Sequence, residues 1–378
     1  ALSVVVIAQN DEDVIGRSLS AVVNQDLDDE YEVLLVASGS DRTVDIARSE
    51  FPRVKTIQLP TPVLPGVARN IGLWLSRGAY ITFPGSHVWL GERSLQHRLT
   101  AHDAGWDMVT TAVRNGNTSG PGWTSYLIDH SGQLPSRPSG VFHGAPGHAS
   151  YVTDDLIEIG GFPIDMRAGE DTVVNQRLTA SGRRAFYCSE STFWHASPST
   201  TWPHFVKHRF TRGYALGRIL RGDGTPWRLR RVLSVCWSVA RRRVKALREG
   251  VAWADPETRR HFARRRPAIA LGLAASITGT ATSLMRPGRL SGHDDVRELP
   301  VAPGHSPRIV AIGGRPGPGR RGLLAPADRE AAARALEVLV EICSMVEDVQ
   351  PALALNVTAA SVTIESDGNR TISMSEAV

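Results

Sequence analysis

The chain has 378 residues, of which 42% are hydrophobic and 21% are charged, so it can form a sizeable core and wholesale disorder is excluded. Its three cysteines are far apart and form no CxxC pair, which excludes a zinc knuckle and a disulfide framework. The net charge is +5, yet residues 207–266 hold 18 Lys and Arg against 4 Asp and Glu, a local charge of +14. This segment indicates an anionic partner, either nucleic acid or anionic lipid.

Short apolar runs alternate with helical patterns through the first 100 residues. Such alternation predicts βαβ units and an α/β domain with a mainly parallel central sheet. Ligands of such sheets bind at the carboxyl ends of the strands. The predicted strands are 3–8, 32–36, 54–59 and 80–83, and the predicted helices are 14–23, 43–49 and 66–76.

The next 90 residues are less regular. Residues 115–148 are rich in Gly, Pro, Ser and His, which predicts a long irregular loop region. A helix is predicted at 172–181, with Gly182 as its C-terminal cap, followed by two short strands at 184–188 and 191–194.

Arginine-rich helices are predicted from Trp202 to Arg266, and an uncharged stretch of 19 residues, 267–285, follows them. A membrane-spanning helix needs about 20 predominantly apolar residues. Because this stretch contains five Ser and Thr residues, two interpretations stay open: a membrane-inserted or interfacial helix, and a packed helix of a soluble domain.

The remainder of the chain divides by composition. We expect four units: an α/β domain at 1–220, a basic helical membrane-associated segment at 221–290, a Gly/Pro/Arg-rich linker at 291–325 and a small α+β tail at 326–378. The tail pattern predicts a helix at 328–349 and strands at 353–364 and 370–373. The Asp367-Gly368 pair between those strands favours a hairpin. The tail indicates no chemistry.

Five segments of residues 1–220 resemble, in the same order, those of the family 2 glycosyltransferases. The resemblance implies a GT-A fold, as in nucleotide-diphospho-sugar transferases, and it ends before residue 290. The segments are SVVVIAQNDEDVIGRSLSAVVNQ, ASGSDRT, PGVARNIGLWLSRGAYITF, GGFPIDMRAGEDTVVNQRLTASG and FWHASPSTTWPHFVKHRFTRGYALG.

Enzymes of this family move a sugar from a nucleotide-diphosphate donor to an acceptor hydroxyl with inversion, which requires a general base. The resemblance implies that Asp171 is this base and that Glu170 lies beside it. A helix N-terminus favours carboxylates at this place. The alternative interpretation is that Asp171 only caps the helix that follows.

The same resemblance implies that residues at or near the ends of the predicted strands bind the donor. Arg69 has an alternative interpretation, as the partner of a surface carboxylate. The expected donor-binding residues are Asn10, Glu12, Ser38, Arg69, Asn70 and His87.

The sequence departs from the family pattern at two places. The family's second-loop aspartate falls on Ala37, and its DxD metal motif falls on Gly85-Ser86-His87. Three interpretations stay open. In the first, His87 and His195 hold a metal, and imidazoles suit Zn²⁺ better than the Mg²⁺ or Mn²⁺ of a carboxylate site. In the second, basic side chains replace the metal at the diphosphate. In the third, the domain is degenerate and binds a nucleotide sugar without catalysis.

The last matched segment implies contacts with the acceptor or the diphosphate from His195, His208, Arg209 and Arg212, although a solvated helix face is the alternative for the arginines. We therefore predict a glycosyltransferase at the cytoplasmic face of the plasma membrane. Its partners would be a nucleotide sugar, a lipid-linked or envelope-polysaccharide acceptor and anionic lipid. The alternative is a non-catalytic GT-A domain that binds a nucleotide sugar or scaffolds a partner enzyme. Nucleic acid is not expected, because no recognition module or set of stacking aromatics is present.

Overall fold

The computed structural model describes residues 1–286, apart from 60, 144–146, 165 and 222–225, and the backbone of three strands near the C-terminus. The expected linker at 291–325 and the expected helix at 328–349 lie outside the described residues. The three C-terminal strands are β10 (Leu353–Thr358), β11 (Ser361–Ser366) and β12 (Arg370–Ser375), which form an antiparallel sheet in this order. The predicted strand at 353–364 is therefore two strands, and β11 pairs with β12 as the hairpin pattern predicted.

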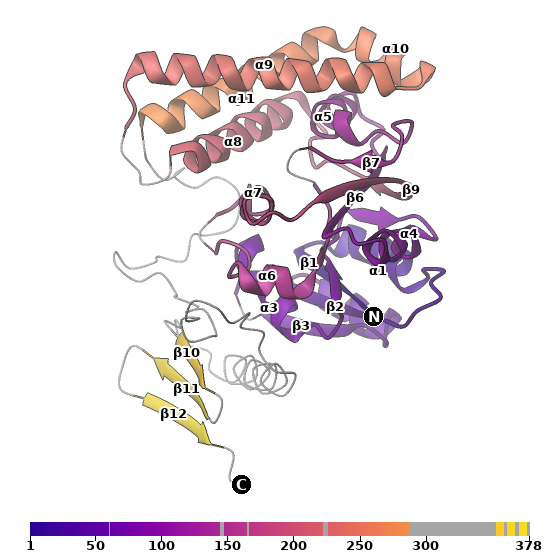
Figure 1. Ribbon diagram of the computed structural model, residues 1–378, viewed down its shortest axis with the longest axis vertical. Helices are drawn as coiled ribbons and strands as arrows, with labels where there is room; N and C mark the ends of the chain where they lie inside the picture. Colours follow the sequence, from indigo (N-terminus) through magenta and orange to yellow (C-terminus); the bar gives the residue numbers. More distant parts are fainter. Residues whose placement is uncertain are drawn as a thin grey trace.

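One mixed, mostly parallel sheet of nine strands forms the centre of the main domain (Figure 1). Strands β3, β2, β1 and β4 are parallel, β8 is antiparallel to both β4 and β6, and β9 is parallel to β6. The order is β3-β2-β1-β4-β8-β6-β9-β5, with β7 against β9. The bounds are Leu2–Gln9 (β1), Tyr31–Ser38 (β2), Lys55–Leu59 (β3), Tyr80–Thr82 (β4), Val88–Leu90 (β5), Met108–Asn115 (β6), Gly140–Val141 (β7), Ser150–Val152 (β8) and Ala185–His195 (β9).

Helices cover both faces of this sheet. Alternate residues of β1 enter two separate apolar clusters: Val4 and Val6 pack in the cluster that contains Leu19 of α1, and Val5 packs in the cluster that contains Leu73 of α3. The predicted α/β architecture is thus confirmed. The helices are α1 (Glu12–Val23), α2 (Thr43–Glu50), α3 (Pro65–Leu75), α4 (Ser94–Asp103), α5 (Gly120–His130), α6 (Thr153–Glu158) and α7 (Glu170–Ala180).

The prediction of an irregular loop at 115–148 is wrong, because α5 lies within it. The Ser119 side chain caps this helix by accepting a hydrogen bond from the Gly122 backbone N–H, and Pro121 occupies the first turn. Proline is tolerated there because the first backbone N–H groups of a helix have no intrahelical acceptor. The Gly and Pro that suggested a loop are therefore signals of a helix start.

The two strands predicted at 184–188 and 191–194 are one strand, β9. An irregularity in its pairing with β6 explains the difference: Cys188 lies opposite Thr111, and Thr192 lies opposite the next residue, Ala112. The intervening residues bulge, and Ser191 turns inward to donate a hydrogen bond to the Ser94 carbonyl at 3.0 Å.

Four C-terminal helices form a layer beside α5 (Figure 1): α8 (Trp202–Arg221), α9 (Leu229–Trp253), α10 (Pro256–Arg264) and α11 (Arg266–Met285). α11 packs closely along α8 because small residues face each other. A Cβ atom added to Gly213 would lie 1.9 Å from the Ser276 carbonyl oxygen, and Thr280 donates a hydrogen bond to the Gly213 carbonyl at 2.9 Å. One face of the uncharged stretch is thus covered by protein.

Candidate active site

The loops that follow β1 and β2 meet at the carboxyl edge of the sheet. Asn10 takes the left-handed conformation, with φ 55°, and its side-chain oxygen accepts a hydrogen bond from the Ser40 backbone N–H at 2.9 Å. Ser38, the last residue of β2, is buried beside this contact. The predicted donor residues Asn10 and Ser38 therefore lie together where a ligand of a parallel sheet is expected.

Asp11 joins this loop to the loop after β4. Its carboxylate accepts hydrogen bonds from the Gln9 backbone N–H at 2.8 Å and from the Ser86 hydroxyl at 2.7 Å. Sequence reasoning missed Asp11, although its position two residues beyond the end of a parallel strand was a usable signal. It supplies a carboxylate beside the segment in which the family pattern expects the DxD motif.

The Gly85-Ser86-His87 segment lies against β1 through a bridge between Ile7 and Gly85. A Cβ atom at Gly85 would lie 3.0 Å from Cε1 of the His87 ring, so the imidazole occupies the space that a carboxylate at position 85 would need. Burial lowers the pKa of His87, the nearby Asp11 carboxylate opposes this shift and Arg69 adds to it. His87 is therefore a neutral imidazole that interacts electrostatically with both Asp11 and Arg69.

Two other predicted donor residues are occupied by protein contacts. The Asn70 amide donates to the Phe162 carbonyl and accepts from the Phe162 backbone N–H, both at 2.8 Å, so it fixes the Gly161-Phe162 turn. The Glu12 carboxylate accepts from the Arg42 backbone N–H at 3.1 Å. Both side chains hold loops in place, and we assign them no donor contact.

Helix α7 carries the two acidic residues of the predicted catalytic pair. It begins directly after Gly169, whose φ of 89° turns the chain into the helix, and no side chain caps it. Glu170 is 6% exposed and forms an ion pair with Arg69, whereas Asp171 is half-buried and accepts a hydrogen bond from the Thr172 N–H at 2.7 Å. Asp171 is the second residue of the helix rather than its cap, so the capping interpretation does not describe it.

Basic side chains approach these carboxylates from two sides. Burial works against the charged form of Arg69, but the Glu170 and Asp171 carboxylates raise its pKa. The Asp129 carboxylate raises the pKa of Arg212, burial opposes it, and Asp171 and Glu170 add to the rise. Asp171 thus lies in the field of two guanidinium groups.

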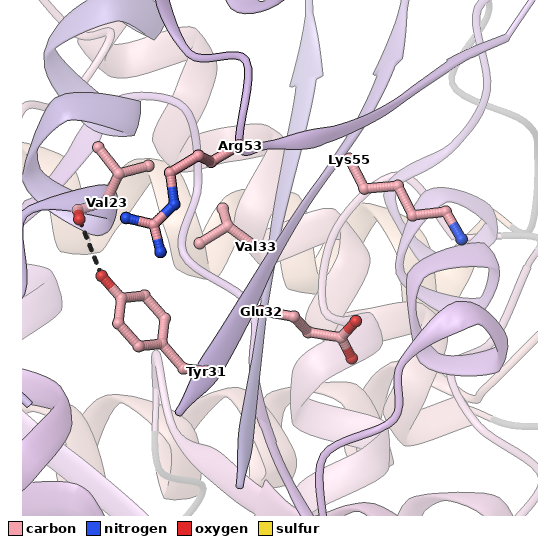
Figure 2. Close-up of a pocket in the computed structure, with 6 residues that line it drawn as sticks. All are labelled: Val23, Tyr31, Glu32, Val33, Arg53 and Lys55. Carbon is pink, nitrogen blue, oxygen red and sulfur yellow. Dashed lines mark hydrogen bonds between the residues drawn. The ribbon is translucent and has the colours of Figure 1, made fainter. Parts of the chain in front are cut away.

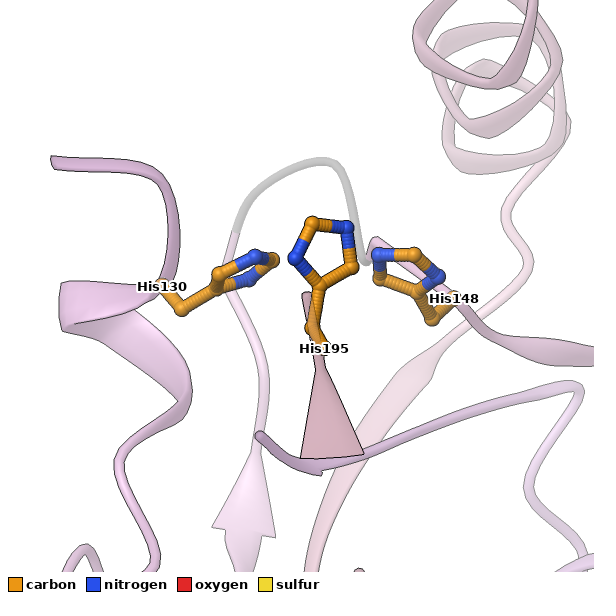
Figure 3. A group of neighbouring side chains, drawn as sticks. All are labelled: His130, His148 and His195. Carbon is orange, nitrogen blue, oxygen red and sulfur yellow. The ribbon is translucent and has the colours of Figure 1, made fainter. Parts of the chain in front are cut away.

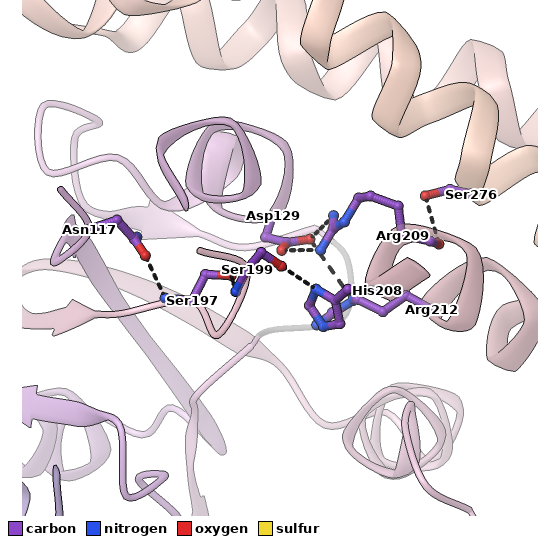
Figure 4. A network of polar contacts seen from close by, with 8 residues as sticks. All are labelled: Asn117, Asp129, Ser197, Ser199, His208, Arg209, Arg212 and Ser276. Carbon is purple, nitrogen blue, oxygen red and sulfur yellow. Dashed lines mark hydrogen bonds and ion pairs between the residues drawn. The ribbon is translucent and has the colours of Figure 1, made fainter. Parts of the chain in front are cut away.

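Arg209 was predicted to contact the acceptor or the diphosphate, and this prediction is wrong because the side chain is buried. Arg209 is 2% exposed, and its two terminal nitrogens donate to the two carboxylate oxygens of Asp129 at 2.7 and 2.6 Å (Figure 4). The pair ties α8 to α5. Arg212, one turn later, has its Nε 4.0 Å from an Asp129 carboxylate oxygen, and its side chain is 54% exposed. His208 bonds to Ser199 at 3.2 Å, and burial lowers its pKa to about 3.

His195 ends β9 and lies at the centre of a group of histidines. Its ring contacts that of His87 with a centroid separation of 5.0 Å, and those of His130 and His148 at 4.8 and 5.4 Å. Figure 3 shows the rings of His130, His195 and His148 side by side. Sequence reasoning found His87 and His195 but missed His130 and His148, because both lie in the segment predicted as an irregular loop.

A separate hollow lies at the opposite edge of the sheet (Figure 2). It is lined by residues around the beginning of β2 and β3, and the Tyr31 hydroxyl there donates to the Val23 carbonyl at 2.9 Å. Because ligands of parallel sheets bind at the other ends of the strands, this hollow does not correspond to the donor site. Its lining is Val23, Tyr31, Glu32, Val33, Arg53 and Lys55.

Comparison with known proteins identifies the domain that builds this edge. Residues 3–160 match the family model described as "Glycosyl transferase family 2". These residues are a family 2 glycosyltransferase domain. A curated Haemophilus influenzae protein, an "Uncharacterized glycosyltransferase", is 29% identical to this chain over 102 residues, which are 26% of this chain and 40% of that protein.

The chain is similar to solved structures. The mannosyltransferase PcManGT from Pyrobaculum calidifontis, in complex with GDP-Man and Mn²⁺, superposes with a TM-score of 0.52 at 18% identity, over 75% of this chain and 86% of that chain. TarS 1-349 of S. aureus gives a TM-score of 0.45 at 17% identity, over 75% and 90%. The family match and the superposition with PcManGT confirm the predicted GT-A fold of the family 2 domain.

Proposed function

We propose that the chain transfers a sugar from a nucleotide-diphosphate donor to an acceptor hydroxyl with inversion, with Asp171 as the general base. The observation that carries the proposal is the difference between two adjacent carboxylates. Glu170 is committed to Arg69, whereas within the described part of the chain Asp171 hydrogen-bonds only to its neighbour Thr172. The Asp171 carboxylate is half-buried and is not engaged by a basic side chain through a hydrogen bond among the described residues, so it is available to accept a proton from an approaching hydroxyl.

The proposed reaction is a single displacement at the anomeric carbon of the donor sugar. Asp171 takes the proton of the acceptor hydroxyl, and the oxygen forms a bond to the anomeric carbon of the donor sugar. The bond from that carbon to the diphosphate breaks, and its electron pair leaves with the nucleoside diphosphate. Attack opposite the leaving group inverts the anomeric configuration. The exposed Arg212 is available to balance the charge that develops on the diphosphate.

The residues at 85–87 do not fit a hard divalent cation. Mg²⁺ and Mn²⁺ prefer carboxylate and other oxygen ligands, whereas Gly85 has no side chain and His87 fills the space beside it. Among the described residues, Asp11 supplies a carboxylate beside this segment, and its Oδ2 atom already accepts two hydrogen bonds. We therefore assign the leaving diphosphate to basic side chains and derive no step through a metal at this segment.

We further propose that α9 holds the protein on an anionic membrane, which favours a lipid-linked or envelope-polysaccharide acceptor at the cytoplasmic face. Five exposed apolar residues of α9 recur at helical spacing and lie within an arc of about 80°. Arg230, Arg241 and Arg248 flank this arc on one side and Arg243 on the other. The apolar residues are Leu229, Leu233, Trp237, Val244 and Val251, of which Trp237 is 72% exposed.

This arrangement moves the expected membrane contact from α11 to α9. α11 is the one described helix long and apolar enough to span a membrane, but a third of it is buried and it packs against α8. A helix with an apolar stripe bordered by arginines suits the headgroup boundary of a bilayer. Attraction of the arginines to anionic lipid is screened by salt, whereas insertion of Trp237 and Leu233 is not.

Flotation with liposomes tests the membrane proposal. The parent protein is expected to stay on anionic liposomes at high salt, while the variant Leu233→Ser/Trp237→Ser is released. Trp253→Ser is the matched control, because Trp253 is 42% exposed on the same helix but lies outside the stripe. Equal retention of the stripe variant and the control at high salt would contradict the assignment of α9.

Incubation with labelled UDP- and GDP-sugars tests the transfer proposal. Binding at the carboxyl edge followed by transfer to an extracted lipid acceptor is the expected result, and EDTA should leave both unchanged. A protein that binds a nucleotide sugar but turns over with none of the acceptors would favour the non-catalytic alternative.

A further inference from the structure

Three histidines from distant parts of the chain converge beside the candidate active site. His130 is the last residue of α5, His195 is the last residue of β9, and His148 lies just before β8. One nitrogen atom of each ring lies within 4.8 Å of the corresponding atom of the other two (Figure 3). Each residue is thus held at the end of a packed element, which fixes the approach of the three rings.

The nitrogens of this group are short of hydrogen-bond partners. Nδ1 of His130 and Nδ1 of His195 are both buried and have no partner among the described residues. A buried polar atom without a partner destabilises the folded state, because it has lost its hydrogen bonds to water. Two unpartnered nitrogens on neighbouring rings are expected where both bind the same ligand.

The chain also accepts backbone strain at this place. His148 has a φ of 53°, and only Asn10 shares a positive φ among the described residues other than glycine. A non-glycine residue in this region is uncommon, and such residues gather at functional sites. The strained backbone directs the His148 ring toward the rings of Phe193 and His195, whose centroids are 4.7 and 5.4 Å away.

The protonation state suits metal coordination. Burial lowers the pKa of His130 to about 4 and lowers the pKa values of His148 and His195 well below their usual range. One nitrogen of each ring lies within 4.8 Å of those of the other two, so three lone pairs can be offered to one ion. A neutral imidazole is the ligand form of histidine.

We propose that His130, His148 and His195 form a binding site for one transition-metal ion of the Zn²⁺ class. Imidazole nitrogens select Zn²⁺, Ni²⁺ or Cu²⁺ over Mg²⁺ and Ca²⁺. Three nitrogens at about 2.0–2.1 Å from Zn²⁺ in a tetrahedral arrangement lie about 3.4 Å apart, so the rings close by about 1.5 Å at most. The fourth position then stays open to water or an anionic ligand.

This site is distinct from the segment at 85–87. His87 contacts His195, but it is not one of the three residues whose nitrogens lie within 4.8 Å of one another, and its own charged neighbours are Asp11 and Arg69. The metal site does not depend on the proposed sugar transfer, because metal binding is measured without any substrate. A chain that binds Zn²⁺ through these rings but transfers no sugar would uphold the site and contradict only the proposed function.

Calorimetric titration of the chelator-treated full chain with Zn²⁺, and with Mg²⁺ as a comparison, tests the site. One Zn²⁺ per chain and no Mg²⁺ at comparable concentration are expected. The variants His130→Gln, His148→Gln and His195→Gln should each weaken Zn²⁺ binding by at least about 100-fold. His143→Gln, which changes an exposed histidine outside this group, and His87→Ala should retain it.

If the variants do not fold, X-ray absorption of the Zn²⁺-loaded parent chain tests the proposal instead, because it identifies the atoms bound to the metal. Scattering from about three imidazole rings is the expected signature. A first shell made of oxygen alone would overturn the proposal, as would a parent chain that binds no Zn²⁺ or variants that bind it as tightly as the parent does.

Discussion

The Arg69 guanidinium is paired with the Glu170 carboxylate, across 101 positions of sequence. The pair joins the second turn of α3 to the first turn of α7, and Glu170 is 6% exposed. It therefore fixes the position of Asp171, the next residue, relative to the carboxyl edge of the sheet. A residue of the predicted donor site thus serves to position the predicted base.

Removal of one member of this pair is expected to cost more than removal of both. Arg69→Leu leaves a buried carboxylate without its partner, and breaking a buried ion pair in this way costs about 3–5 kcal/mol. Arg69→Leu/Glu170→Gln removes the charge as well and should recover part of that loss. Chemical denaturation of the two single variants and the double variant measures the coupling. Additive losses would show that the pair does not stabilise the fold.

The contact between α8 and α11 gives a second prediction. A Cβ atom at Gly213 would lie 1.9 Å from a backbone oxygen of α11, which cannot move aside as a side chain can. Gly213→Ala should therefore lower the free energy of unfolding by about 1–3 kcal/mol. Gly132→Ala is the control, because nothing lies within 4 Å of its added Cβ. Equal stability of the two variants would mean that the helices do not pack as described.

The pH dependence of stability follows from His102, which is 4% exposed. Its ring bonds to the Trp106 carbonyl and to the Ser150 hydroxyl, both at 2.8 Å, and burial lowers its pKa to about 4. The unfolded chain, with a histidine pKa of about 6.5, binds the proton more readily. The contribution of His102 is thus complete above pH 6.5 and is lost as the pH falls toward 4, by on the order of 3 kcal/mol.

Urea denaturation between pH 7 and pH 4 measures this effect. The stability of the parent should fall more steeply than that of His102→Gln over this range, since glutamine does not titrate. Parallel curves for the two proteins would show that His102 is not the buried neutral group described.

The spacing of apolar residues along the chain made the first half of the fold predictable. The apolar spacing of Ile15, Leu19 and Val22 identified α1, and the uniformly apolar run of β1 reflects its burial on both faces. α5 was missed because Gly and Pro at a helix start resemble a loop, and the bulge in β9 left a gap in the strand pattern.

The site was only partly predictable for a similar reason. Segment order made Asp171, Arg69 and His195 candidate site residues. The pairing of Arg69 with Glu170 depends on the approach of two helices, which no local sequence pattern reports. The burial of Arg209 against Asp129 likewise depends on how α8 meets α5. His130 and His148 become neighbours only when α5, β8 and β9 are assembled.

The transfer rate of Asp171→Asn, measured with a labelled nucleotide sugar and an acceptor accepted by the parent, tests the central claim most directly. Asparagine keeps the shape of the side chain but cannot take the acceptor proton, and general-base catalysis contributes about 10²–10⁴-fold. Transfer is expected to fall by that factor, while donor binding and thermal stability stay close to those of the parent. Full transfer activity in Asp171→Asn would contradict the assignment of Asp171 as the base.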